Sequence, residues 1–193
     1  MARGHRSLIL IIILISTIGA IIYFYRDSAL TPMTNQPNLS NTDLGGGNFT
    51  LSSPAFLPNS LIPAKYTCDG ENFNPPLAIS GLPPAAKSLV LIMDDPDAPG
   101  RTWTHWVKWN IPPTLTEIHD NEEPSGVSGR GTGGNLTYQG PCPPSGIHRY
   151  FFKLYALNTE LFLPLGATKT EVEQAMKEHI LDQAELVGRY GRS

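Results

Sequence analysis

An uncharged stretch of nineteen residues, Ser7–Tyr25, constrains this chain more than any other feature, because it sets a membrane-type segment apart from the rest. An α-helix of that length spans roughly 28 Å, close to the hydrocarbon thickness of a bilayer. Arg3 and Arg6 precede it, and aromatic residues at its far end suit the membrane interface. We therefore expect residues 1–26 to form a cytoplasmic stub and a transmembrane signal-anchor, with the remaining chain extracytoplasmic. Cleavage as a signal peptide, giving a secreted protein, is the alternative, although Ser16–Ala20 offers only a poor cleavage site.

The rest of the chain predicts a linker and one domain. Residues 27–48 are rich in Asn, Thr, Pro, Ser and Gly, a composition typical of a solvated linker. Residues 49–193 are enough for one domain whose core folds without metals or staples. The chain carries 14 basic and 17 acidic residues with no cluster of Lys or Arg, which argues against a nucleic-acid partner.

Most of the domain has the pattern of β-strands separated by proline and glycine. The C-terminal region predicts one strong helix, because Thr168–Glu171 fits a capping box and apolar residues recur at helical spacing through Gln183. The strands that we predict are 49–56, 88–93, 104–111, 148–157 and a short last strand at 186–190. The sequence therefore predicts a mainly β domain with a peripheral helix.

The segment Asp95-Pro96-Asp97-Ala98-Pro99 follows the apolar run 88–93, which places two carboxylates at a strand end. Taken alone it is a turn, since Asp and Pro are common turn formers. The next predicted strand opens with Trp103-Thr104-His105-Trp106, and the alternation of side chains along a strand puts Trp103 and His105 on one face. An indole and an imidazole beside a rigid, acidic turn indicate one wall of a small polar pocket.

A second proline-stiffened segment, Gly140–Tyr150, predicts the opposite wall. It leads into a strand on which His148 and Tyr150 share one face and Arg149 lies on the other. Histidine and tyrosine side chains and backbone N–H groups are donors that suit a phosphate or a carboxylate. From this parity we expect Arg149 to pair with Asp97 in an internal ion pair rather than to contact a ligand.

Other uses of these residues stay open at this point. Cys142 with His148 as base would make a hydrolase, although no helix start follows Cys142 to lower its pKa. A zinc site from His105, His148 and Asp95 has suitable ligand types but no recognised ligand spacing. An oxidising compartment would permit a disulfide between Cys68 and Cys142, which sequence alone cannot show.

The loop that precedes the second wall offers one further motif and one further function. Gly129–Gly134 matches the pattern G-x-G-x-x-G, but no strand pattern precedes it and no helix pattern follows it. We interpret it as a flexible loop that leads to the pocket wall. The longer loop 122–139 is the candidate contact surface if the chain is a protein-interaction or protease-inhibitor module.

The two long motifs, DPDAP and GPCPPSGIHRYFFKLYAL, with the Trp and His strand opening between them, resemble the phosphatidylethanolamine-binding protein family. The likeness is to its prokaryotic, Raf-kinase-inhibitor-like branch of the YbhB/YbcL type, and it extends over about residues 49–191. It implies two packed antiparallel sheets with a few short peripheral helices, and a small anion-binding cavity near one end. By motif position the candidate ligand-binding residues are Asp95, Pro99, Trp103, His105, Gly140, Pro141, His148 and Tyr150, with Asp97 added from the same motif.

For function, the resemblance implies binding of phosphate-like or phospholipid head groups, and regulation rather than catalysis. Kinase inhibition, known for eukaryotic relatives, does not transfer to an extracytoplasmic domain. With the predicted anchor, we expect a membrane-tethered binding module that is not an enzyme and needs no cofactor or metal. A homodimer and an unidentified protein partner stay open.

Overall fold

The computed structural model describes residues 48–192. The predicted anchor and nearly all of the predicted linker therefore lie outside the described residues. Within the described part, no helix is both long and apolar enough to span a membrane. The elements are β1 (Thr50–Ser52), η1 (Ala64–Tyr66), β2 (Leu77–Ser80), β3 (Ser88–Asp95), β4 (Trp103–Ile111), β5 (Glu117–Ile118), β6 (Val127–Ser128), β7 (Gly146–Leu157), α2 (Lys169–Met176) and β8 (Ile180–Arg192).

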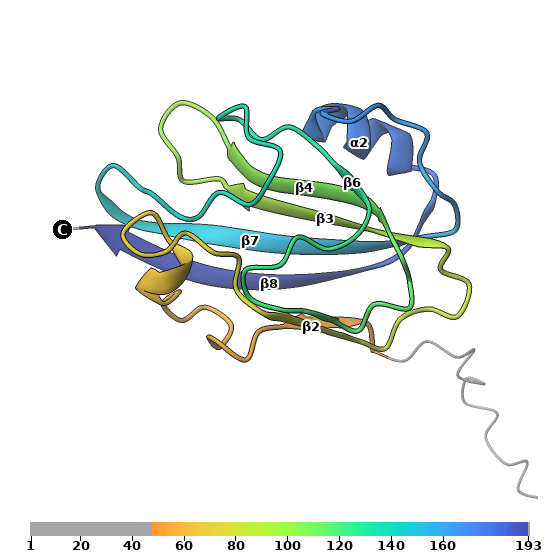
Figure 1. Cartoon of the computed structure of the whole chain (residues 1–193), viewed down its shortest axis with the longest axis horizontal. Helices are drawn as coiled ribbons and strands as arrows, with labels where there is room; N and C mark the ends of the chain where they lie inside the picture. The colour runs from red at the N-terminus through yellow and green to blue at the C-terminus, as the bar shows by residue number, and fades with distance from the viewer. Residues whose placement is uncertain (1–47, 193) are drawn as a thin grey trace, which may run out of the picture. The chain divides into compact units, whose positions relative to one another are not determined.

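These strands form two antiparallel sheets (Figure 1). The smaller sheet has the order β1-β2-β5, and the larger has the order β6-β4-β3-β7-β8. The long strand β7 pairs with β3 on one side and with β8 on the other. The prediction of a mainly β fold with two antiparallel sheets and few helices is confirmed, and the predicted strands at 88–93, 104–111 and 148–157 are the cores of β3, β4 and β7.

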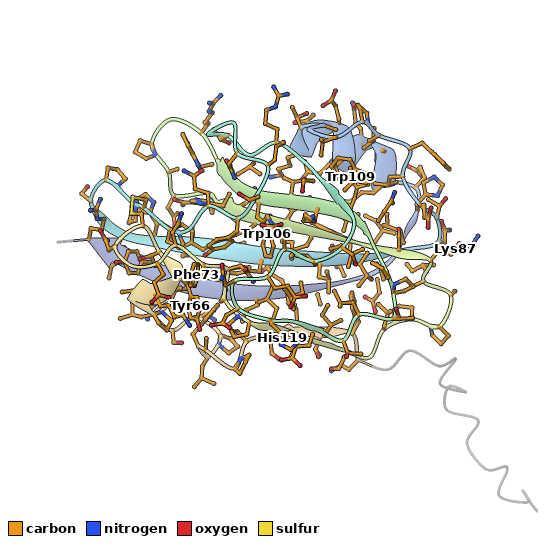
Figure 2. All side chains as sticks on the ribbon, viewed as in Figure 1. Tyr66, Phe73, Lys87, Trp106, Trp109 and His119 are labelled. Carbon is orange, nitrogen blue, oxygen red and sulfur yellow. A yellow bond between two sulfur atoms is a disulfide. The ribbon has the colours of Figure 1, made fainter. Side chains whose placement is uncertain are left out.

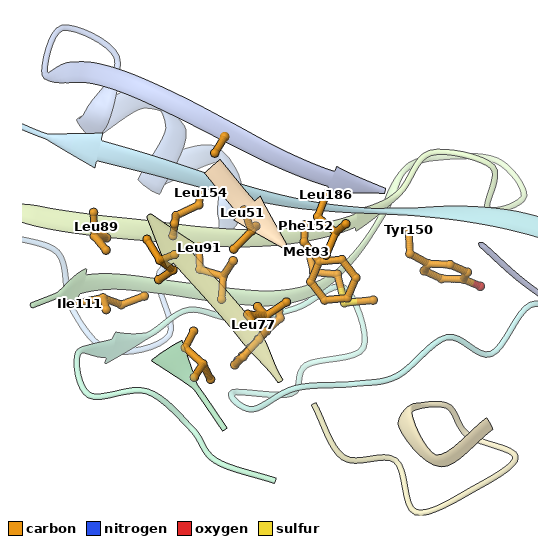
Figure 3. Close-up of a cluster of buried hydrophobic side chains, with 14 of the residues drawn as sticks. Leu51, Leu77, Leu89, Leu91, Met93, Ile111, Tyr150, Phe152, Leu154 and Leu186 are labelled. Carbon is orange, nitrogen blue, oxygen red and sulfur yellow. The ribbon is translucent and has the colours of Figure 1, made fainter. Parts of the chain in front are cut away.

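The main hydrophobic core fills the space between the two sheets (Figure 3). Because side chains alternate along a strand, every second residue of β3 and β7 faces the smaller sheet. Each fully buried leucine or phenylalanine in such a core stabilises the fold by about 1.5–3 kcal/mol. The residues that meet there include Leu51, Leu77, Leu89, Leu91, Met93, Phe152 and Leu154.

A second core lies on the opposite face of the larger sheet, under α2. Val90, Ile92 and Trp109 pack there against Val172 and Met176 of the helix. In Figure 2 Trp109 lies toward α2, whereas Trp106 lies toward the smaller sheet. The larger sheet is therefore buried on both faces along β3 and β4, which explains why all eight residues of β3 are buried.

An irregularity near the end of β4 fixes the loop between β7 and α2. Lys108 and Ile111 are three positions apart, but their partners in β3, Leu91 and Leu89, are only two apart, so β4 carries one extra residue. Asn110 in this bulge has a φ of 54°, a left-handed conformation that asparagine tolerates better than most residues. Its side-chain amide donates to the carbonyl oxygen of Leu161 at 2.9 Å and accepts the Leu161 N–H at 2.8 Å.

The C-terminal prediction was wrong in part. The capping box is confirmed, because the Glu171 N–H donates to the Thr168 side chain and the Thr168 N–H donates to the Glu171 carboxylate at the start of α2. The helix ends at Met176 rather than near Gln183, and the predicted short strand at 186–190 belongs to the thirteen-residue strand β8. Pairing of β8 along almost the whole of β7 outweighs the helical periodicity of residues 177–183. The predicted strand at 49–56 is reduced to β1.

Candidate functional site

A cavity of about 270 Å³ opens where β3 ends and where β4 and β7 begin. We call it the histidine pocket. The turn after β3, the first residues of β4, the segment that precedes β7 and the start of β7 each contribute to its wall. The lining residues are Asp95, Ala98, Pro99, Trp103, His105, Gln139, Cys142, Pro143, Pro144 and His148.

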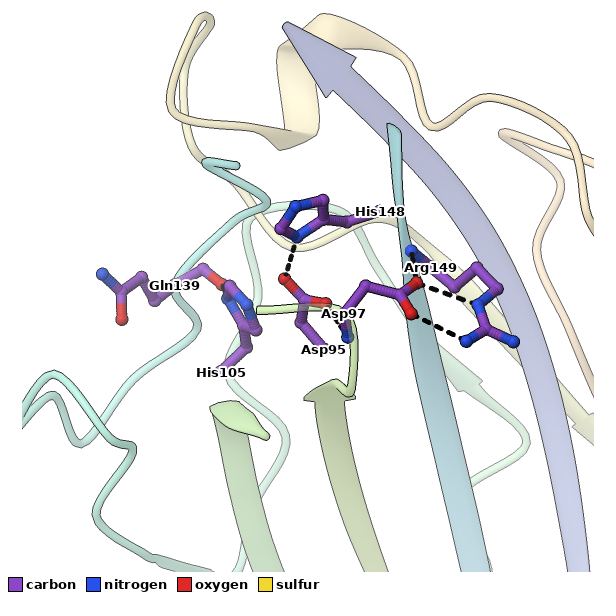
Figure 4. A network of polar contacts seen from close by, with 6 residues as sticks. All are labelled: Asp95, Asp97, His105, Gln139, His148 and Arg149. Atoms are coloured by element: carbon purple, nitrogen blue, oxygen red, sulfur yellow. Dashed lines mark hydrogen bonds and ion pairs between the residues drawn. The ribbon is translucent and has the colours of Figure 1, made fainter. Parts of the chain in front are cut away.

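A buried ion pair joins two sides of this pocket (Figure 4). His148 Nδ1 lies 2.7 Å from Asp95 Oδ2. The other carboxylate oxygen, Oδ1, accepts the N–H of Asp97 at 2.8 Å. Since a carboxylate only accepts, His148 donates through Nδ1, and Nε2 is the ring nitrogen left to a ligand. Only 5% of the Asp95 side chain and 10% of the His148 side chain are exposed, so this pair is held in a low-dielectric setting.

A β-bulge aims His105 into the pocket. Trp106 lies opposite Met93 while Thr104 lies opposite Asp94, so His105 is the extra residue in β4. Bulges of this kind re-aim a side chain next to functional sites. The His105 Nδ1–H donates to the carbonyl oxygen of Gln139 at 2.7 Å, which again leaves Nε2 to a ligand.

The surroundings of His105 decide its charge. Its ring packs edge-on against Tyr150, with ring centroids 5.3 Å apart. Burial lowers the pKa of His105 below its ordinary value, and this exceeds the opposing effects of the Gln139 carbonyl and the Asp95 carboxylate. His105 is therefore a neutral imidazole near pH 7 that presents an acceptor to the pocket.

Tyr150 lies behind the pocket rather than in its lining. Its side chain is fully buried, and its hydroxyl has no hydrogen-bond partner among residues 48–192. Burial and then the Asp95 carboxylate raise the pKa of Tyr150 well above its ordinary value, so the hydroxyl keeps its proton. A buried donor without a partner costs free energy unless a ligand or a water meets it.

The wall opposite β3 is fastened to the turn after η1. Cys68 and Cys142 form a disulfide with Cα atoms 5.4 Å apart, which resolves the pairing that the sequence left open. The Cys68 N–H also donates to the Pro141 carbonyl oxygen at 3.1 Å, and the Gly140 N–H donates to Asn72 Oδ1 at 2.8 Å. A Cβ at Gly140 would lie 2.6 Å from Asn72 Oδ1, so the close approach requires glycine. A disulfide-bonded Cys142 has no thiolate, which removes it as a nucleophile in this state.

The Asp97–Arg149 pair is confirmed in its partners but not in its place (Figure 4). Arg149 Nε and Nη2 donate to the Asp97 carboxylate at 2.8 and 2.7 Å. The hydrogen bonds from Arg149 lower the pKa of Asp97 to about 2. However, 54% of the Arg149 side chain is exposed, so the pair is a surface pair rather than the internal pair that we predicted. It lies outside the pocket lining because alternation along β7 turns Arg149 away from His148.

Of the nine predicted ligand-binding residues, the structure brings five together in the lining. Gly140, Pro141 and Tyr150 support the pocket from behind, and Asp97 lies outside it. Four of the missed lining residues stand inside the two motifs. The sequence could not indicate Gln139, because this residue fixes His105 through its backbone carbonyl oxygen, a group that every residue has. The missed lining residues are Ala98, Gln139, Cys142, Pro143 and Pro144.

Two other motifs have a structural outcome. Among the described residues, no three His, Cys, Asp or Glu side chains converge in a way that could hold a metal ion. The short strand β6 ends directly before Gly129–Gly134, so the expectation that no strand precedes this run was wrong, whereas the element that follows it is β7 and not a helix, as expected. The run is held by backbone hydrogen bonds, from the Gly129 N–H to Val107 at 2.8 Å and from the Thr132 N–H to Thr104 at 2.9 Å.

Fold and pocket together define a class, an antiparallel two-sheet domain with a small cavity at the end of the larger sheet. A family model described as "Phosphatidylethanolamine-binding protein" matches residues 52–191. The chain belongs to the phosphatidylethanolamine-binding protein family.

Relatives and solved structures agree with this assignment. A UPF0098 protein of Methanothermobacter thermautotrophicus is 53% identical over 148 residues, covering 74% of this chain and 98% of that protein. The protein PH1269 of Pyrococcus horikoshii, also named UPF0098, is 49% identical and covers 77% and 81%. The crystal structure of the homologue CT736 from Chlamydia trachomatis has a TM-score of 0.73 at 40% identity, covering 75% of this chain and 98% of that one. Escherichia coli YbcL, described as a member of the mammalian family, has a TM-score of 0.69 at 31% identity, with 75% and 99% covered, which supports the prokaryotic branch.

Proposed function

We propose that the chain is a membrane-tethered, extracytoplasmic binding protein whose histidine pocket takes a small anion, a phosphate or a phospholipid head group. The observation that carries this proposal is the arrangement of His105 and His148. Both rings donate a hydrogen bond from Nδ1 to a fixed acceptor, and this orients Nε2 toward a ligand before the ligand arrives. The unpartnered Tyr150 hydroxyl beside them is a further donor.

Proton uptake is part of this proposal. A neutral imidazole that donates through Nδ1 offers only a lone pair at Nε2, which does not bind the oxygen of an anion. When the ring takes up a proton, Nε2 becomes a charged donor, and hydrogen bonds between ions are the stronger ones. At His105, the nearby Asp95 carboxylate favours the added positive charge. Anion affinity should therefore rise as the pH falls.

The regulatory, non-catalytic character of the proposal rests on what the pocket wall offers. Among the residues that the structure describes, none that lines the pocket is a serine, threonine or tyrosine, and the lining cysteine is disulfide-bonded. The groups present are suited to holding an anion rather than attacking a bond. The apolar segment Ser7–Tyr25 supports the tether, and the family name supports a lipid head group as one source of the phosphate.

Calorimetric titration of the full-length protein tests the proposal with two probes. Phosphoethanolamine represents a head group, and sulfate is an anion whose own charge stays constant between about pH 5.5 and about pH 7.5. We expect both to bind, with sulfate affinity rising by up to about tenfold per pH unit as the pH falls. His148→Ala and His105→Ala should lose binding, whereas His119→Ala, which removes an exposed imidazole, should not. No binding at millimolar concentration, or equal binding by all variants, would reject the pocket and leave the loop 122–139 as the functional surface to test.

A further inference from the structure

A second and larger cavity, of about 480 Å³, lies on the other side of the first residues of β4. Trp103 and His105 line the histidine pocket, whereas Thr102 and Thr104 line this second cavity. The β3–β4 turn, the loop 129–134 and the start of α2 each contribute to its wall. We call it the arginine cleft, after Arg101 and Arg130 in its lining.

The carboxylates in and around the arginine cleft already have partners. Asp94, only 1% exposed, accepts from Lys169 at 2.6 Å, from Lys153 at 3.3 Å and from Thr104 at 3.2 Å. Glu173 lies 3.5 Å from Lys169. Lys169 is thus neutralised by two carboxylates, and neither these acids nor this lysine is left to a ligand.

Glu171 is engaged as well. The Thr168 N–H and hydroxyl both donate to its Oε2 at 2.7 Å. These hydrogen bonds lower the pKa of Glu171, and the charge of Arg130 adds to the shift. Glu171 therefore caps the N-terminus of α2, so this helix N-terminus by itself would not attract an anion.

The groups left over in the cleft are cationic donors. Arg101 and Arg130 are exposed, and between residues 48 and 192 no carboxylate comes within ion-pair distance of either guanidinium. Each guanidinium carries five N–H donors in a planar fork that fits phosphate oxygens. Two such groups at one cavity favour a ligand that carries more than one negative charge.

The backbone holds Arg130 in place. Its N–H donates to the Ala167 carbonyl oxygen at 3.0 Å, and the residue forms a parallel bridge to Thr168. The next residue, Gly131, donates to the Asn135 carbonyl oxygen at 2.9 Å, and a Cβ there would collide with the Asn135 side chain. The glycine-rich run that matches no nucleotide-binding context thus has a structural role: it turns tightly enough to set Arg130 at the edge of the cleft.

We propose that the arginine cleft is a second anion site, separate from the histidine pocket, for a multiply charged phosphoryl oxyanion of the pyrophosphate type. Its volume is nearly twice that of the pocket, in line with a ligand of more than one phosphate group. Because no histidine of the described part of the chain lines it, its affinity should not follow the histidine titration that governs the pocket.

Titration of the full-length protein with pyrophosphate and with orthophosphate tests this site. In Arg101→Gln/Arg130→Gln, pyrophosphate affinity for the cleft should fall by about tenfold or more. Both side chains are exposed, so the variant should fold, which its melting temperature verifies. The control Lys87→Gln/Lys177→Gln removes the same net charge at exposed positions outside the cleft and should leave affinity unchanged.

Backbone amide shifts locate the binding. Pyrophosphate should move the resonances of Gly131 and Thr132, and it should still do so in His148→Ala, where the pocket is impaired. Shifts confined to Gly140 and His148, equal affinities in the arginine and control variants, or a preference for orthophosphate would each overturn the second site. None of these results would count against the histidine pocket, whose test uses its own variants.

Discussion

Two carboxylates of one five-residue motif, Asp95 and Asp97, make ion pairs of the same length in different environments. Asp95 pairs with His148, and Asp97 pairs with Arg149, each with a closest approach of 2.7 Å. The first pair is almost wholly buried and lines the pocket, while the second is partly exposed on the outside of the sheet. Distance therefore does not distinguish the functional pair from the surface pair; burial does.

The strongest test of this contrast is His148→Ala. The change leaves the Asp95 carboxylate buried without its partner, and breaking a buried pair costs about 3–5 kcal/mol in the free energy of unfolding. Chemical denaturation measures the loss. Asp95→Asn/His148→Ala, which also removes the charge, should recover part of it. A loss below about 1 kcal/mol would mean that the two pairs are energetically alike.

Opening the disulfide weakens the pocket side in another way. Cys68→Ser/Cys142→Ser should lower the free energy of unfolding by about 2–4 kcal/mol, because the bond closes a loop between residues 74 apart. The same variant should bind sulfate more weakly, since Gln139–Pro144 is then fastened by hydrogen bonds alone. Unchanged sulfate binding with reduced stability would show that the disulfide stabilises the fold without shaping the pocket.

His105 in the pocket and Asp97 outside it should affect the free energy of unfolding in different pH ranges. Burial holds the pKa of His105 below that of the unfolded chain, so the unfolded state takes up the proton first as the pH falls through about 6.5. The free energy of unfolding should therefore decrease over that window, by at most about 1.4 kcal/mol per pH unit. Denaturation across this range should show the decrease in the wild type and a smaller one in His105→Asn. Asp97, with its pKa lowered to about 2, loses its contribution only as the pH falls below about 4.

The smallest effect belongs to the surface pair. Arg149→Ala should cost less than about 1 kcal/mol, and less still at high salt, because exposed ion pairs are screened by water and ions. Lys65→Ala, which breaks another exposed pair, is the matched control. Thermal melting of both variants checks this, and a loss near that of His148→Ala would show that exposure is a poor guide here. This expectation replaces the marked destabilisation that an internal pair would have implied.

The sequence predicted the parts of the site that depend on local rules. Alternation along the strand correctly separated His148 from Arg149 and grouped Trp103 with His105. It did not predict the bulge at His105, which turns Trp106 toward the smaller sheet as well. Proline-rich segments marked both walls. The orientation of His105 by the Gln139 carbonyl could not be foreseen, because backbone groups carry no sequence signal.

The fold was predictable where strands have a regular pattern and failed where tertiary pairing decides. Residues 177–183 have helical periodicity, yet β8 begins at Ile180 because β7 offers a long edge for antiparallel pairing. The strands β2, β5 and β6 are two to four residues long, too short for a periodic signal. Alternation along β7 predicts which face Arg149 occupies, but the exposure of its pair with Asp97 depends on what covers that face.

The pairing of Asp95 with His148 joins positions 53 residues apart in the chain. Such a contact exists only after β3 and β7 have come together, late in any order of assembly that begins with local structure. A molecule that binds beside this pair, at His148 Nε2, can therefore bind the native state alone. By mass action, every increase in its concentration shifts the folding equilibrium, so ligand supply in the protein's surroundings would also govern how long each copy stays folded.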